Sequence, residues 1–173
     1  MTNKFKVFNL GIILFLVIFT SGCGVYSFTG ANLNPEIQTI SIQQFFNDSG
    51  DGPADLGQKF NDQIRNYFQN NTNLTMLKGN GDLQLEGSIT GFRYTPIAPE
   101  ASVGNTTGAS RMQRLTITIK VKYINTYDET QNFERSFSFY QDYNSDQQTQ
   151  SAAEPGLVNE ILDQIIVDIF MAS

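Results

Sequence analysis

Residues 115–124 read LTITIKVKYI and carry the clearest pattern in this sequence. Every second residue is apolar or aromatic: Leu115, Ile117, Ile119, Val121 and Tyr123. The residues between them are threonine and lysine. Because successive side chains of a β-strand point to opposite faces of a sheet, we expect this segment to be a strand with one buried face and one polar face.

Two neighbouring segments repeat this pattern and extend the expected sheet. Residues 82–94 (DLQLEGSITGFRY) alternate, and Gly87 and Gly91 fall on their apolar side, which predicts a bulge or a close approach by a helix. Residues 133–140 (FERSFSFY) place aromatic rings on one face of a partner strand. Arg135 lies on that same face, which is expected near an edge or an end of the sheet.

Two further segments show the helical period. Within residues 54–70 the apolar side chains recur on one face of a helix: Leu56, Phe60, Ile64, Tyr67 and Phe68. Residues 151–171 repeat isoleucine and leucine at similar spacing, and Ser151 with Glu154 fits a capping box at the start of that helix. Residues 37–46 (IQTISIQQFF), which precede both helices, are rich in β-branched side chains and predict the first strand.

The expected order is therefore β-α-β-β-β-α, with an antiparallel pair between residues 115–124 and 133–140. Each strand shows one apolar face, so both helices should cover the same side of the sheet. The sequence predicts an α+β domain: a four-stranded mixed or antiparallel sheet with two helices packed on one face. Residues 95–114 contain two prolines and small polar side chains, and we expect them to form a long loop.

The composition excludes most catalytic chemistry. The 173 residues contain no histidine and one cysteine, which excludes Ser-His-Asp and Cys-His arrangements, histidine-ligated zinc and an internal disulfide. The carboxylate pairs Asp48–Asp51 and Asp142–Asp146 lie in turn-like sequence, where aspartate usually bonds its own backbone. A net charge of −6 argues against nucleic-acid binding. We expect a non-enzymatic binding, structural or anchoring protein without a metal site.

The N-terminal segment resembles a bacterial lipoprotein signal. Two lysines precede an apolar run of about 10 residues, well short of the ~20 that a membrane-spanning helix needs. Small residues then lead directly to Cys23. We expect residues 1–22 to be a cleaved signal peptide and Cys23 to carry covalent lipid, with no other cofactor. The alternative is an ordinary signal followed by an inert cysteine. Residues 23–36 would be the lipidated tether, and residues 37–173 a single domain.

Five cations gather in one part of the chain: Arg93, Arg111, Arg114, Lys120 and Lys122. The arginines flank the predicted loop, and the lysines point outward from the next strand. Because arginine forks suit phosphate, these residues are candidates for binding an anionic lipid. The alternative is a solvated sheet face whose charge is balanced by Glu86. Both interpretations stay open on the residues alone.

Five segments together resemble the lipopolysaccharide-assembly lipoprotein family, LptE. They are CGVYSFTGA (23–31), GDLQLEGSITGF (81–92), YTPIAP (94–99), RLTITIKVKY (114–123) and VNEILDQIIVDIF (158–170). The resemblance covers essentially the whole chain. The expected order of helices and strands agrees with the family fold.

This resemblance implies a lipoprotein on the periplasmic side of the outer membrane that is not a catalyst. It would plug and help to assemble a large LptD-like β-barrel, and it would assist insertion of lipopolysaccharide into the outer leaflet. The implied partners are that barrel, lipopolysaccharide and the membrane, but no nucleic acid. Two other functions remain: a free lipoprotein that binds or carries an amphipathic lipid ligand, and a purely structural envelope protein.

Overall fold

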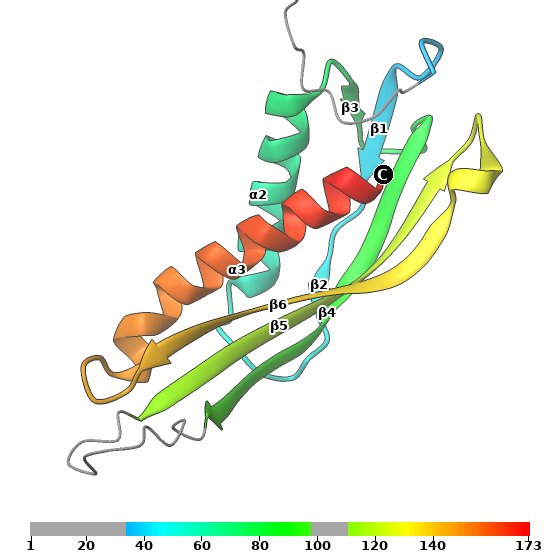
Figure 1. Ribbon diagram of the computed structural model, residues 1–173. Helices are drawn as coiled ribbons and strands as arrows, with labels where there is room; N and C mark the ends of the chain where they lie inside the picture. Colours follow the sequence, from blue (N-terminus) through cyan, green and yellow to red (C-terminus); the bar gives the residue numbers. More distant parts are fainter. Residues whose placement is uncertain (1–33, 98–110) are drawn as a thin grey trace, which may run out of the picture.

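The computed structural model describes residues 34–97 and 111–173. In chain order the elements are β1 (Thr39–Ile42), β2 (Phe46–Asn47), α2 (Leu56–Asn71), β3 (Thr75–Leu77), β4 (Leu83–Ile97), β5 (Met112–Asn125), β6 (Phe133–Asn144) and α3 (Gln150–Ala172). The strands form one six-stranded sheet in the order β3-β1-β4-β5-β6, and β2 also pairs with β4. Both helices lie on one side of this sheet (Figure 1).

The three longest strands form an antiparallel meander, which contains the antiparallel pair expected between residues 115–124 and 133–140. β5 pairs with β4 on one side and β6 on the other, so Ile119 lies between Ile89 and Phe137. The alternating residues of β5 from Leu115 to Tyr123 are at most 1% exposed. β1, β2 and β3 add only parallel pairs, so the sheet is mixed. The α+β class and the two helices are confirmed.

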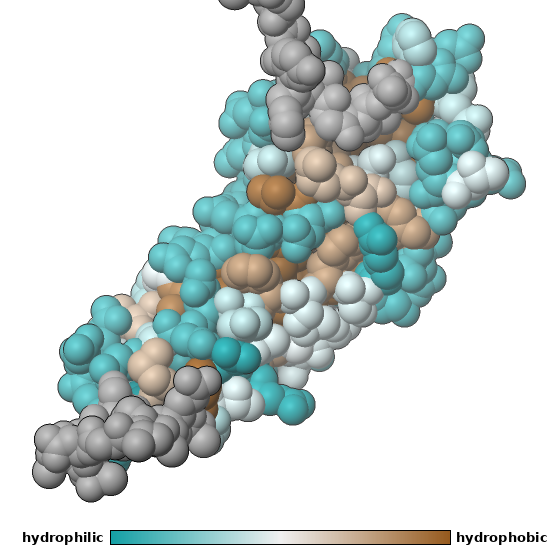
Figure 2. All heavy atoms as spheres, viewed as in Figure 1, coloured by the Kyte–Doolittle hydropathy of each residue, from teal (hydrophilic) through white to brown (hydrophobic). Residues whose placement is uncertain are grey.

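The hydrophobic core fills the layer between the sheet and the helices. α2 contributes Leu56, Phe60 and Ile64, and α3 contributes Ile161 and Ile165, all of which are 0% exposed. Full burial of such a side chain stabilises a fold by about 1.5–3 kcal/mol. On the helix side, hydrophilic side chains cover much of the surface, and apolar ones show between them (Figure 2).

The strand expected at residues 37–46 is two short strands, so the expectation of four strands was wrong. The side-chain amide of Asn61 accepts from the Phe45 N–H and donates to the Phe45 carbonyl oxygen, both at 2.9 Å. Because the Asn61 side chain binds both backbone groups of Phe45, these groups are not available for pairing in the sheet. β1 therefore ends at Ile42, and β2 begins at Phe46. The three residues of β3 are too few to show a period. The observed order is β-β-α-β-β-β-β-α.

The loop expected at residues 95–114 is shorter than predicted. The ladder between β4 and β5 continues to the pair Ile97–Met112, beyond the expected strand ends on both sides. Among the described residues, β1 and then β2 pair with the other side of β4, and β2 ends at Asn47. Past that point β4 has an open edge, where the missing N–H of Pro96 is tolerated. The remaining part of the expected loop lies outside the described residues.

β4 contains a bulge in the region that its glycines indicated. The register shifts between Ile89 and Gly91, which leaves one extra residue on β4. Gly91 therefore faces Thr118 on the polar side, and its expected place on the apolar side was wrong. A Cβ atom on Gly87 would collide with the carbonyl oxygen of Lys120. The close approach at Gly87 is thus made by β5 and not by a helix.

The capping box expected at the start of α3 was also wrong. The helix begins at Gln150, and the preceding Thr149 makes no side-chain cap hydrogen bond. The Glu154 carboxylate instead accepts a 3.0 Å hydrogen bond from the Tyr94 hydroxyl on β4. Because the sheet supplies this donor, Glu154 is not available to reach back to the helix terminus.

Candidate functional site

The side of the sheet opposite the helices is polar, and we call it the open face. Its side chains alternate with the core residues of β4, β5 and β6: Glu86, Ser88, Arg93, Arg114, Thr116, Thr118, Lys120, Lys122, Glu134, Ser136, Ser138, Tyr140 and Asp142. Small hydroxyl side chains occupy its middle. Charged side chains lie towards both ends, which we call the lysine end (Lys120, Lys122, Glu86 and Glu134) and the arginine end (Arg93, Arg114, Tyr140 and Asp142).

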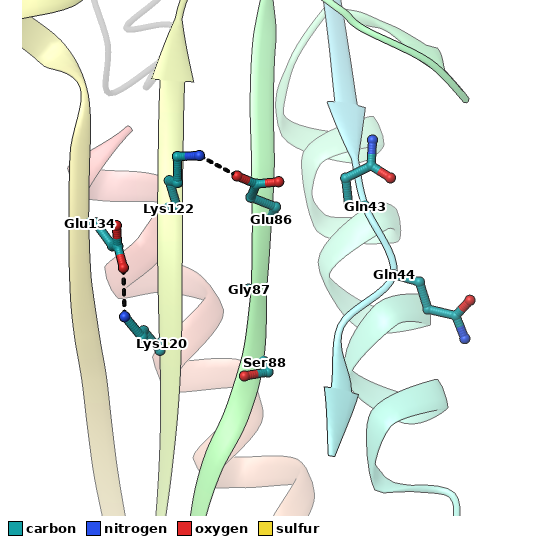
Figure 3. A pocket seen from close by; sticks show the side chains of 8 residues that line it. All are labelled: Gln43, Gln44, Glu86, Gly87, Ser88, Lys120, Lys122 and Glu134. Atoms are coloured by element: carbon teal, nitrogen blue, oxygen red, sulfur yellow. Dashed lines mark hydrogen bonds and ion pairs between the residues drawn. The ribbon is translucent and has the colours of Figure 1, made fainter. Parts of the chain in front are cut away.

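At the lysine end, both lysines form ion pairs with neighbouring strands. Lys122 Nζ lies 2.6 Å from a carboxylate oxygen of Glu86 on β4, and Lys120 Nζ lies 2.5 Å from Glu134 on β6 (Figure 3). The hydrogen bond with Glu86 raises the pKa of Lys122, and the hydrogen bond from Lys120 lowers the pKa of Glu134. The opposite charges therefore balance within the face, as the solvated-face interpretation expected for Glu86.

A pocket of about 460 Å³ lies beside these ion pairs (Figure 3). Gln43, Gln44, Gly87 and Ser88 complete its lining, so its walls are mostly polar. On the short strand β2, Phe46 lies opposite Ser88 in register, and this residue is 60% exposed. A polar hollow next to an exposed aromatic ring resembles a protein contact surface more than a site for an apolar ligand.

At the arginine end, Arg114 is fixed by two partners. Its Nε and Nη2 atoms donate to the two carboxylate oxygens of Asp142 at 2.7 and 2.9 Å, and its guanidinium lies 3.6 Å from the centre of the Tyr140 ring. The hydrogen bonds from Arg114 lower the pKa of Asp142. Arg93 lies one strand away, opposite Thr116. Among the described residues, no carboxylate forms an ion pair with Arg93.

The structure brings four of the five candidate cations onto the open face. The fifth, Arg111, precedes β5, and its backbone N–H donates to the carboxylate of Asp146 at 2.9 Å. Its guanidinium forms no ion pair with a carboxylate in the described part of the chain. Arg93 and Arg111 are thus the candidates whose charge has no such partner there. Ligand binding by any of the five residues stays a prediction, and Cys23 lies outside the described residues.

A second pocket, of about 520 Å³, lies beside β4 between the turn at residues 49–53 and the start of α3. Arg93, Tyr94 and Glu154 contribute to its lining. Burial is the main cause that raises the pKa of Tyr94, and the hydrogen bond to Glu154 adds to it. The ligand-carrier alternative expected an apolar pocket between sheet and helices. The two pockets described here are surface hollows with polar walls instead.

The open face offers hydroxyl groups, balanced charges and exposed aromatic rings. Tyr140 is 48% exposed at the arginine end, and Phe46 lies near the lysine end. The described residues contain no group of three or more acidic, cysteine or histidine side chains that could hold a metal ion. In the same residues, no helix has the length and apolar character needed to cross a membrane. Exposed aromatic rings beside polar groups are typical of a protein contact surface.

A comparison with protein families gives one match that spans this fold. The family model described as "LptE: Lipopolysaccharide-assembly" matches residues 37–173, which include every described helix and strand. The chain belongs to the LptE family. It is therefore a non-enzymatic lipoprotein of lipopolysaccharide assembly that associates with the transport machinery, and the expected absence of catalysis is confirmed by this membership. No curated protein sequence matches this LptE-family chain.

Several solved structures are similar to this LptE-family chain. A minor lipoprotein from Acinetobacter baumannii has 13% identity and a TM-score of 0.49, with 78% of this chain and 88% of that chain covered. A hypothetical protein from Chlamydia trachomatis has 8% identity and a TM-score of 0.49, covering 78% and 96%. The rare lipoprotein B from Shewanella oneidensis has 12% identity and a TM-score of 0.45, covering 78% and 90%.

Sequence reasoning missed Glu134 and Tyr140 on the open face, and its assignment of Asp142 to a turn was wrong, because Asp142 lies on β6 and pairs with Arg114. All three lie on β6, where they approach Lys120 and Arg114 across the ladder. The signal was present in the sequence. Pairing β5 with β6 across the turn at 126–132 places the acidic residues of one strand near the cations of the other. The register of that pairing decides which charges meet, and the single-strand pattern did not fix it.

Proposed function

We propose that this LptE-family protein is held at the periplasmic side of the outer membrane by lipid on Cys23. There it plugs and helps to assemble a large LptD-like β-barrel, and it assists insertion of lipopolysaccharide into the outer leaflet. The observation that carries the proposal is the family match over residues 37–173. Cleavage after residue 22 and lipidation of Cys23 are part of the proposal.

The open face supports an association with a polar barrel wall. The interior of a membrane β-barrel is polar, so a plug must present a surface that is stable against polar groups. Burying an unpaired charge is costly, whereas paired and hydrogen-bonded charges are tolerated. Lys120, Lys122 and Arg114 each have a carboxylate partner, so this face can be covered without leaving those charges uncompensated.

The cations without a described carboxylate partner support a contact with an anionic lipid. Among the five candidates, Arg93 belongs to the arginine end and is exposed, and Arg111 directly precedes the adjacent strand β5. Arg114, Lys120 and Lys122 would contribute less, because a ligand must compete with Asp142, Glu134 and Glu86. We therefore propose Arg93 and Arg111 as the first contacts for lipopolysaccharide phosphates.

The test of the barrel association is a mild-detergent pull-down of the tagged full-length protein from outer membranes, with mass spectrometry of the bound chains. We expect one large β-barrel in near-equal amount. The Cys23→Ser variant should recover much less barrel, because lipid confines the protein to the membrane and raises its effective concentration there. Ser27→Ala is the matched control and should behave as wild type. Absence of any barrel partner would overturn the proposal.

The test of the lipid contact is a titration of the full-length protein with lipopolysaccharide. Arg93→Glu should weaken binding by about tenfold, because it removes one charge-assisted contact. Lys78→Glu is the matched control, since it makes the same charge change at an exposed position after β3. Equal affinities of the two variants would remove Arg93 from the proposed contact and leave the barrel association untouched.

A further inference from the structure

Among the described residues, β6 is the terminal strand of the sheet, and its outer edge pairs with no other strand. Its residues Phe133–Asn144 pair with β5, and in the described part of the chain no strand lies on its other side. β3, at the opposite end of the sheet, has three residues, whereas β6 has 12. A long strand edge with unpaired N–H and C=O groups is a template for pairing with another chain.

The direction of the free backbone groups follows from the ladder. Just past β6, the N–H of Ser145 donates to the carbonyl oxygen of Arg111 at 2.8 Å, so odd-numbered residues of this strand face β5. The register between β5 and β6 contains no shift. Because peptide groups alternate along a strand, the peptide groups that face the free edge are those of the even-numbered residues: Glu134, Ser136, Ser138, Tyr140 and Asp142.

The two acidic side chains of β6, Glu134 and Asp142, are turned away from this edge. Glu134 reaches across the sheet to Lys120, and Asp142 reaches across to Arg114. Ser138, which lies between them, directs its hydroxyl to Thr118 on β5 at 2.9 Å. All three side chains therefore lean towards the sheet, and they leave the backbone of the edge accessible.

One charge on β6 has no carboxylate partner among the described residues, and it lies on the helix side. The Arg135 guanidinium is 4.6 Å from the centre of the Phe133 ring and 4.7 Å from that of Phe137. The Arg135 cation therefore makes cation–π contacts with both rings. A strand added beside β6 would place a side chain directly opposite Arg135 on the same face.

We propose that β6 binds an extended segment of a partner protein by strand addition, with an acidic residue of that segment opposite Arg135. Main-chain hydrogen bonds to the even-numbered residues would provide affinity, and the carboxylate would provide register. This inference goes beyond the association with a barrel wall. In a closed barrel every wall strand is paired on both edges. The added segment must therefore be a part of a partner protein that is not a wall strand.

A second copy of this chain fits β6 less well than such a segment. Antiparallel self-pairing within one continuous sheet keeps the two faces separate, so residues opposite each other lie on the same face. The acidic residues of β6, Glu134 and Asp142, lie on the open face, whereas Arg135 lies on the helix side. No register of self-pairing therefore places a carboxylate directly opposite Arg135.

The test compares backbone amide exchange of the full-length protein in isolated outer membranes with exchange of the same protein purified alone. In membranes, the amides of Ser136, Ser138 and Tyr140 should exchange at least about tenfold more slowly. The amides of Phe137 and Phe139 should be slow in both samples, because β5 protects them. Equal exchange of the even-numbered amides in both samples would overturn the inference.

Two pairs of variants separate edge pairing from other causes of protection. Ser138→Pro removes the N–H at the free edge, whereas Ser138→Ala loses the same hydroxyl contacts and keeps the N–H. Arg135→Glu reverses the charge at an exposed position, whereas Arg135→Lys keeps it. Ser138→Pro and Arg135→Glu should abolish the protection, and Ser138→Ala and Arg135→Lys should retain it. Protection that survives in Arg135→Glu would contradict the acidic partner.

The outcome is independent of the barrel pull-down. Barrel recovery without protection of β6 would retain the plug and overturn strand addition, and protection without a barrel would do the reverse. Co-purification of tagged and untagged copies together with protection would assign the edge to a second copy and overturn the proposed partner segment.

Discussion

On β5, Ile119 is 0% exposed against the helices, whereas the next residue, Lys120, is exposed and paired with Glu134 on β6. The same alternation holds along the whole meander, so one set of strands builds two surfaces. The helix side is a close-packed apolar layer, in which the removal of even one methylene group lowers the stability of the fold. The open face consists of hydroxyl groups and ion pairs in contact with water, which contribute little to stability.

The difference separates what holds the fold from what is available for partners. Side chains on the helix side are committed to packing, so changes there should act on the free energy of unfolding. Side chains on the open face can change with little effect on folding, and their effect should appear in binding. The predictions below test this division, from the largest expected change in stability to the smallest.

The largest effect is expected for Ile119→Ala. It removes a fully buried side chain and leaves a cavity, so the free energy of unfolding should fall by about 2–5 kcal/mol. Urea unfolding followed by circular dichroism measures it. Thr118→Ala, one residue away on the open face, should cost less than about 1 kcal/mol. A similar loss of unfolding free energy in both variants would contradict the proposed difference between the two faces.

Asn61→Ala tests a polar side chain that is buried beside the apolar core. Asn61 is 4% exposed and binds both backbone groups of Phe45, so truncation leaves a buried N–H and a buried C=O unpaired. The free energy of unfolding should fall by about 1–3 kcal/mol. Asn66→Ala, at an exposed position of the same helix, is the control and should be near neutral. A neutral Asn61→Ala would show that Asn61 does not determine the break between β1 and β2.

Asp82→Asn tests a polar contact at the end of the sheet. The Asp82 carboxylate accepts hydrogen bonds from the N–H groups of Gln38 and Thr39 and from the Thr39 hydroxyl, and these bonds lower its pKa below 3.8. A lowered pKa stabilises the folded state above pH 3.8, and this contribution is lost as the pH falls through the folded-state pKa.

The urea midpoint of Asp82→Asn should therefore lie below that of wild type at neutral pH, by less than for Asn61→Ala. The gap should close as the pH falls below 3.8. The control is Asp163→Asn at an exposed position of α3, for which we expect no such gap. A gap for Asp82→Asn that stays constant with pH would assign its effect to something other than the carboxylate charge.

The smallest effect on stability is expected for the exposed ion pair between Lys122 and Glu86. Glu86→Gln, Lys122→Gln and the double variant should unfold at the wild-type urea midpoint, because water screens such pairs. Barrel recovery should behave differently. Each single variant leaves one charge uncompensated when the face is covered, so recovery should fall, and the double variant should restore it. Equal barrel recovery by all three variants would show that the lysine end is not part of the proposed contact with the barrel.

The long alternating and helical segments were predictable because each carries its own period. The strand at residues 115–124 has every second side chain in the core, and the helix at residues 54–70 has one apolar stripe. β3 was not predictable, because three residues show no period and its pairing with β1 depends on the rest of the sheet. The break at Phe45 depends on Asn61, which is sixteen positions away.

The candidate site, like the fold, could be predicted only in part from the sequence. Lys120 and Lys122 were placed on the polar side by the alternation of β5, whereas Arg93 and Arg114 were chosen because they flank the expected loop. The carboxylate partners of Arg114, Lys120 and Lys122 follow from the register between strands, which fixes the distance from each cation to each carboxylate. The bulge in β4 also matters, because one inserted residue changes which side chains face outward beyond it.

The sequence by itself determined the α+β class, the two covering helices, the antiparallel pair between residues 115–124 and 133–140, and the resemblance to the LptE family. These follow from local periods and residue types, which need no knowledge of distant segments. Only the tertiary structure decided the splitting of the first strand, the pairing of the open-face charges and the free edge of β6. Each of these depends on which segments pair and in what register. The pairing and the register are fixed only when the apolar faces of all the segments are buried together.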